Sequence, residues 1–167
     1  MSRIATIFLV LLAIGLAVFV GTTERWRSSP ERTIQPGSPL FDFDPEDIAH
    51  IRITNGDQSF RIKREEGGWI LETSTPDTAN PEAVAAIFKT ALATPVLDRI
   101  DPSEIQDKQN LATYGVLKST LQLDFKGDRP LSLLFGKVGA DGNRTYVAFE
   151  KSNAVYLIPN DLAKLIA

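Results

Sequence analysis

The feature that most constrains this chain is an uncharged apolar run from Ile4 to Val20, in which Thr6 has the only polar side chain. As an α-helix rising about 1.5 Å per residue, the run would span about 26 Å, or about 30 Å if it continued through Thr23. That length just crosses the hydrocarbon core of a bilayer. We therefore expect residues 1–23 to form a transmembrane signal-anchor helix, to be set apart from the rest of the chain.

A cleaved secretory signal is the alternative for the same segment. Cleavage after Gly21 would place Phe19 where a small residue is needed. The apolar run is also longer than the core of about 7 to 15 residues that is usual for a signal peptide. Both features favour an uncleaved anchor.

Small residues give the expected helix one smooth stripe. Ala13, Ala17 and Gly21 are spaced at i, i+4 and i+8, the spacing at which another transmembrane helix can approach closely. Alanine and glycine are also simply common in membrane spans. We treat the stripe as a candidate contact with an integral membrane protein.

The charges beside the run bear on orientation. Arg3 lies on one side and Arg25, Arg27 and Arg32 on the other, so charge counting alone weakly favours a domain kept inside. A short N-terminal tail before a soluble C-terminal domain is instead the usual layout of an exported signal-anchor protein. We expect a single-pass membrane protein with its C-terminal domain on the exported side.

Residues 24–39 are predicted to be a juxtamembrane linker, because Ser28–Pro39 holds three prolines and no apolar pattern. Twelve such residues reach about 20 Å if flexible and about 37 Å if fully extended. Residues 40–167 then form one soluble domain, large enough to bury about two-thirds of its unfolded surface. Cysteine is absent from the 167 residues, which excludes disulfides and thiol chemistry.

Charge argues against nucleic acid as a partner. The chain carries −3 overall, and because residues 1–27 contribute +2, residues 28–167 carry −5. Such a surface repels phosphate backbones, and no dense basic stripe with interleaved aromatic residues offsets it.

The first half of the domain has the pattern of an antiparallel meander. Ile48–Thr54 alternates as a half-buried strand does, and Asn55-Gly56 favours a tight hairpin turn. Phe60–Arg64 alternates again, and Glu66–Gly68 turns the chain into a third strand, Trp69–Glu72.

A helix follows, with Asn80 as N-cap, Pro81 at its first position and Thr94-Pro95 as its end. Its residues at core spacing are Val84, Ile87, Phe88, Ala91 and Leu92. A short strand over Val96–Ile100 and a capping box over Asp101–Glu104 lead into a small helical connection.

The remaining residues are again rich in strands. Alternation recurs at Leu121/Leu123/Phe125, Leu131/Leu133, Tyr146/Ala148 and Val155/Leu157, and a last helix places Leu162, Leu165 and Ile166 on one face. Both halves thus read hairpin, further strand and helix, and Ile51–Gly56 parallels Leu121–Gly127. We predict an α+β fold in which the anchor precedes a pseudo-repeated antiparallel β-meander with helices on one face.

The domain resembles a bacterial family known as domain of unknown function 4340. The resemblance rests on Leu40–Ile48, reading LFDFDPEDI, on Gly67-Gly68-Trp69, on Leu111–Val116 and on the closing Val155–Pro159. Members often have an Asp-Pro pair where this chain has Leu117-Lys118. The resemblance implies a domain anchored in the bacterial inner membrane and periplasmic or exported, in some members encoded beside transporter or gliding-motility proteins, and it supplies no catalytic residue.

Several residues invite chemistry and have simpler explanations. Asp42, Asp44, Glu46 and Asp47 are clustered carboxylates of the kind that bind calcium, but Asp47 and Ile53 stand where an EF-hand needs glycine and glutamate. Asp44-Pro45 better fits a capped turn. We therefore expect no metal site.

Other candidate sites are weaker still. His50 is the only histidine and lies opposite Ile51 and Ile53, with no serine or acid placed for a triad. Gly136-Lys137 lacks the order of a phosphate loop, and Asn143–Thr145 matches the short glycosylation signal. The remaining acidic residues are Asp98, Asp101, Glu104 and Asp107. They fit a solvated face of the domain better than acid–base catalysis.

Trp69 and Tyr114 are the aromatic residues that could anchor a protein partner. Core packing beneath the sheet is the alternative for both. With no catalytic residue and no cofactor site expected, the chain is interpreted as a non-enzymatic accessory subunit of an integral membrane complex, for example a transporter-like one. The alternative function is a membrane-surface binding domain for a small ligand or an envelope polymer.

Overall fold

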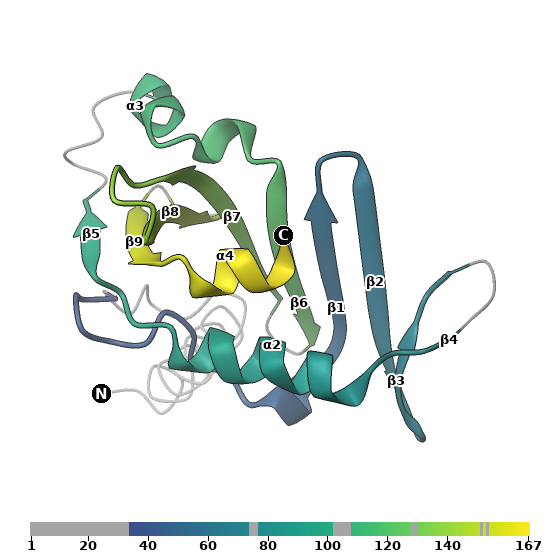
Figure 1. Ribbon diagram of the computed structural model, residues 1–167. Helices are drawn as coiled ribbons and strands as arrows, with labels where there is room; N and C mark the ends of the chain where they lie inside the picture. The colour runs from purple at the N-terminus through teal and green to yellow at the C-terminus, as the bar shows by residue number, and fades with distance from the viewer. Residues whose placement is uncertain (1–33, 74–76, 102–107, 128–129, 151, 153) are drawn as a thin grey trace, which may run out of the picture. The chain divides into compact units, whose positions relative to one another are not determined.

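The computed structural model describes residues 34–73, 77–101, 108–127, 130–150, 152 and 154–167 (Figure 1). The predicted anchor, residues 1–23, and its stripe of Ala13, Ala17 and Gly21 lie outside this part of the chain. Among the described residues, no helix is both long enough and apolar enough to cross a membrane.

The described strands form a single antiparallel sheet of nine, in the order β4-β3-β2-β1-β6-β7-β8-β9-β5. Their bounds are β1 (Ile48–Asn55), β2 (Gln58–Glu65), β3 (Gly68–Leu71), β4 (Asp77–Thr78), β5 (Asp98–Ile100), β6 (Leu121–Gly127), β7 (Leu131–Val138), β8 (Arg144–Phe149) and β9 (Val155–Pro159). The predicted strand over Val96–Ile100 is thus shorter, because Val96 instead hydrogen-bonds back to Ser38.

The described helices are all short except α2 (Pro81–Ala93). The others are η1 (Pro45–Asp47), α3 (Lys108–Thr113), η2 (Val116–Lys118) and α4 (Asp161–Ile166). The predicted α+β class is therefore correct.

Two meanders meet where β1 pairs with β6 at the middle of the sheet. In this pairing Ile53 faces Leu123, and on either side of that pair Ile51 faces Phe125 and Asn55 faces Leu121. Strands β1–β4 lead into α2, and strands β6–β9 lead into α4, the same order of elements in both halves.

The main core lies between the sheet and the pair α2 and α4, which cover the face seen in Figure 1. The Asn80 side chain accepts hydrogen bonds from the backbone N–H groups of Glu82 and Ala83, as expected for the predicted N-cap. Phe88 of α2 stacks on Phe125 of β6 with ring centroids 5.7 Å apart. Each such fully buried large side chain contributes about 1.5–3 kcal/mol to the free energy of unfolding.

A second, smaller cluster lies on the opposite face of the sheet. Its buried members are Val116, Ala148 and Val155. Side chains alternate between the faces of a strand, and the neighbouring Val147 and Tyr156 belong to the main core. α3 and η2 therefore pack on the face opposite α2 and α4, and the prediction that all helices lie on one face is wrong.

Two local predictions also differ from the structure. In the first hairpin, the loop residues are Gly56 and Asp57, because Asn55 still pairs with Gln58 in the ladder. Gly56 has φ +58° and no other residue type in the described chain has positive φ, which fits a glycine-first turn rather than Asn-Gly. In α4, Leu165 is 44% exposed, so it does not share the buried face of Leu162 and Ile166.

Candidate functional site

Trp69, predicted as a partner anchor, is part of the core edge. Its ring packs on Phe88 of α2 at a centroid distance of 5.7 Å. The guanidinium of Arg64 lies 4.7 Å from the Trp69 ring centroid, a favourable cation–π position. Arg64 Nη2 in turn donates to the backbone oxygen of Pro45 at 2.6 Å. Arg64 therefore covers part of the ring that a partner would need.

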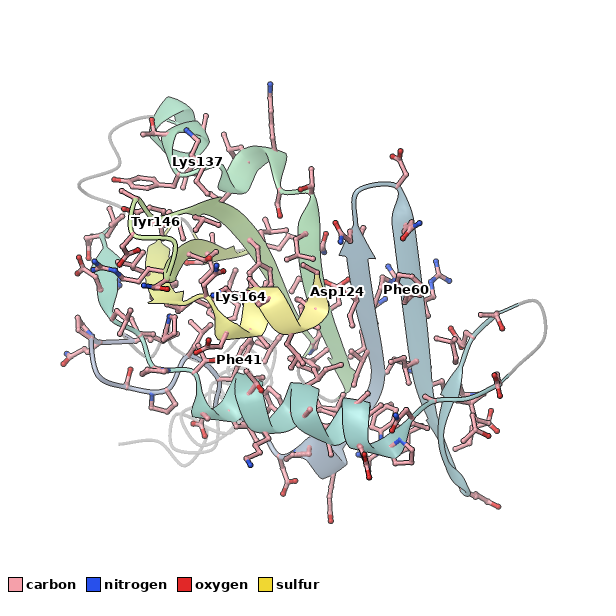
Figure 2. The ribbon with its side chains drawn as sticks, in the orientation of Figure 1. Phe41, Phe60, Asp124, Lys137, Tyr146 and Lys164 are labelled. Carbon is pink, nitrogen blue, oxygen red and sulfur yellow. The ribbon has the colours of Figure 1, made fainter. Side chains whose placement is uncertain are left out.

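Tyr114 lies on the other face of the sheet, in the second cluster. Its ring contacts Tyr146 of β8 at a centroid distance of 5.0 Å, and its carbonyl accepts a hydrogen bond from the Lys137 N–H at 2.8 Å. Lys137 and Tyr146 mark this corner of the molecule in Figure 2. The structure thus separates Tyr114 from Trp69, and for both the packing interpretation agrees with the contacts.

The acidic residues near η1 have a structural role at one position. The Asp44 carboxylate accepts a hydrogen bond from the Glu46 N–H at 2.9 Å and caps η1, as predicted. Within the described residues, no group of three or more acidic, histidine or cysteine side chains is placed to hold a metal. Glu104 and Asp107 lie outside the described residues, and Asp101 pairs with Arg99 at 3.4 Å.

A surface that sequence reasoning missed lies on β1, β2 and β6, on the face opposite α2 and α4. Two rows of side chains cross these strands. In the first row, His50 of β1 faces Lys63 of β2 and Lys126 of β6; in the second, Arg52 faces Arg61 and Asp124. We call the five basic residues of this grid, His50, Arg52, Arg61, Lys63 and Lys126, the cation face.

The charges of the cation face are compensated only in part. Lys63 pairs with Glu65 at 3.3 Å, whereas the ion pairs among the described residues include none of Arg52, Arg61 and Lys126. Asp124 is only 4% exposed and accepts a hydrogen bond from Gln122 at 2.8 Å. The cation face is therefore a local excess of positive charge on a chain whose net charge is −3.

Like charges that face each other across strands destabilise a sheet. Arg52 beside Arg61 is an arrangement of this kind, and the carboxylate of Asp124, which faces Arg52 from β6, offsets it in part. The Nε of Arg52 is buried and has no hydrogen-bond partner in the described structure. An anionic group bound over the two guanidinium groups would relieve the remaining repulsion.

A shallow depression lies on the other face, between α4 and the ends of β6, β7 and β8. Its volume is about 230 Å³, and Leu121 and Phe135 line it together with Lys164 of α4. The buried hydroxyl of Thr145 donates to Asn160 Oδ1 at 2.5 Å beside it. Thr145, part of the predicted glycosylation signal, is thus used in packing.

Comparison with known proteins identifies a family but no individual relative. The family model described as "Domain of unknown function (DUF4340)" matches residues 69–167. This stretch includes Leu111–Val116 and Val155–Pro159, on which the resemblance partly rested, but not Leu40–Ile48. No curated protein and no solved structure gives a significant match. The matched stretch is more than half of the chain, and the protein therefore belongs to the DUF4340 family.

Proposed function

We propose that this chain is a single-pass, membrane-anchored, non-catalytic accessory subunit that binds partner proteins of a membrane complex, for example a transporter-like one. The anchor is residues 1–23, with the stripe of Ala13, Ala17 and Gly21 as its helix-packing face. The domain after the linker is on the periplasmic or exported side of the inner membrane.

The observation that carries the proposal is the cation face. The sheet exposes a grid of basic side chains without a described helix over it, and the guanidinium groups of Arg52 and Arg61 face each other across β1 and β2. Basic side chains arranged in this way favour association with an acidic surface and speed its encounter. They include no activated nucleophile or acid–base pair, so binding is the activity that they support best.

The test is co-purification of tagged full-length protein from native membranes in mild detergent. We expect one partner in stoichiometric amount, reduced by Arg61→Gln with Lys126→Gln and retained with Lys89→Glu. This control changes the net charge by the same two units at an exposed position of α2 on the opposite face. Purification of a monomer without any partner would contradict the proposal.

The anchor is tested in the same preparation by changing Ala13, Ala17 and Gly21 to leucine. Loss of the partner with the protein still in the membrane would assign the contact to the stripe. Release of the wild-type protein by alkaline carbonate would show that residues 1–23 do not anchor it.

The depression beside α4 supports the second candidate, a binding domain for a small ligand or envelope polymer. It combines an apolar lining with Lys164 and polar atoms of Asn160 and Thr145, a mixture found in small-molecule sites. Binding of small carboxylates that Lys164→Gln abolishes and Arg61→Gln leaves intact would favour it.

A further inference from the structure

The spacing of the cation face matches an extended polypeptide. Arg61 and Lys63 are two residues apart on β2, as are His50 and Arg52 on β1. Along a strand this separation is about 6.8 Å, and the two strands lie about 4.8 Å apart. Every second side chain of an extended segment has the same repeat of about 6.8 Å.

The same rows suit carboxylates in particular. Guanidinium groups bind carboxylates through two parallel hydrogen bonds, and the cation face holds Arg52 and Arg61 next to each other. Arg52 is half-buried with its Nε unpaired among the described residues. That nitrogen is buried, so a carboxylate would bind the part of Arg52 that remains exposed.

A flat anionic bilayer fits this surface less well. η2 and α3 pack on the same face of the sheet, over β7 and β8, beside the cation face. A helix with its side chains is about 10 Å thick. Arg52, His50 and Lys63 are half-buried on the sheet, so a flat membrane surface would contact α3 and η2 before it reached these three side chains. A narrow peptide segment could instead lie beside the two helices.

The net charge of the chain also favours a short acidic segment over a long polyanion as the ligand of the cation face. The chain carries −3 overall, and a long phosphate backbone extends past the cation face into that field. A short acidic segment interacts only with the charges of the cation face, because salt screening limits electrostatic interactions to about 8–10 Å at moderate salt.

We infer that the cation face binds an extended acidic segment of a partner protein, with carboxylates at every second residue lying over β1 and β2. The inference rests on the proposed function and specifies its partner. Arg52 is the central anchor, and Arg61, Lys63 and Lys126 flank it.

The test uses full-length protein in detergent and a capped synthetic peptide of about eight residues, long enough to span the rows, with glutamate alternating with serine. We expect saturable binding that weakens with added salt, and a Kd raised about tenfold in Arg61→Gln with Lys126→Gln, since each exposed pair is worth a fewfold in affinity. Arg52→Gln is expected to act similarly. Lys89→Glu, which changes the net charge by as much as the double variant but on the opposite face, should leave the Kd unchanged.

The outcomes separate the alternatives. Arg61 and Lys126 are exposed, so the first variant is expected to stay folded, and its thermal midpoint is measured to check this. Equal weakening by this variant and by Lys89→Glu, or equal binding of a peptide with its glutamates contiguous, would overturn the inference, as would preferential binding to phosphatidylglycerol vesicles through the same residues. If peptide binding fails while a membrane partner still co-purifies, the proposed function survives and this inference does not.

Discussion

At the scale of single residues, the closest packing in the second cluster depends on Gly136 of β7. A Cβ atom at this position would fall on the carbonyl oxygen of Tyr114 and within 2.9 Å of Val116 Cγ1. The absent side chain lets Lys137 donate its N–H to Tyr114. Gly136 thereby joins the η2 segment to the sheet.

We expect Gly136→Ala to lower the free energy of unfolding by about 1–3 kcal/mol, because the backbone of Tyr114 must move. Gly67→Ala is the matched control, since nothing lies within 4 Å of its added Cβ. Chemical denaturation measures both. Equal stability of the two variants would show that the Tyr114 contact is not tight.

A second prediction at this scale concerns Asp141 in the loop between β7 and β8. The hydrogen bond from Arg144, at 2.7 Å, and then that from the Asn143 N–H lower the pKa of Asp141 below 3.8. A lowered pKa means that the carboxylate stabilises the fold above pH 3.8 and loses this effect as the pH falls through the folded pKa. In Arg144→Gln the pKa should rise toward 3.8 in an NMR titration, and an unchanged value would assign the shift elsewhere.

At the scale of elements, α2 holds the first meander against the main core. Its buried residues are Val84, Ile87, Phe88 and Ala91, and the helix begins where Asn80 caps it and Pro81 takes the first position. The first turn depends on this cap because four N–H groups there have no partner within the helix.

We expect Asn80→Ala to lower the free energy of unfolding by about 1 kcal/mol, and Asn80→Asp to retain most of the stability, because aspartate accepts the same hydrogen bonds. Thermal denaturation of the two variants makes the comparison. A similar loss for alanine and aspartate would mean that packing around Asn80, and not its cap, is responsible.

At the scale of the whole molecule, the cation face is expected to lower the stability of the fold while it favours binding of an acidic partner. It places like charges side by side although the chain as a whole is acidic. Sites kept for binding often have this character, because substitutions that relieve them stabilise the fold and weaken function.

Arg61→Gln with Lys126→Gln should therefore leave the free energy of unfolding unchanged or raise it by a few tenths of a kcal/mol, as relief of cross-strand repulsion predicts. Added salt should stabilise the wild type more than this variant, since screening relieves the same repulsion. Denaturation at low and high salt tests both expectations. A clear loss of stability in the variant would instead give these cations a structural role.

The sequence by itself determined most of the local structure. The alternation along β1, β2 and β6 predicted the strands, and the Asn80-Pro81 pair predicted where α2 begins, because these signals depend on neighbours a few residues apart. The family resemblance was likewise carried by short segments, and the match over residues 69–167 agrees with it.

Only the tertiary structure decided the face on which each helix packs and the residues that share a surface. α3 and η2 lie opposite α2 and α4 because Gly136 opens that side of β7, a contact between segments far apart in sequence. The cation face forms because β1 pairs with both β2 and β6, which brings Lys63, His50 and Lys126 into one row. Along the chain, each of these residues has the pattern of an ordinary solvent-facing strand position. Pairing between distant strands, which no local pattern specifies, is the physical reason that the candidate site could not be predicted.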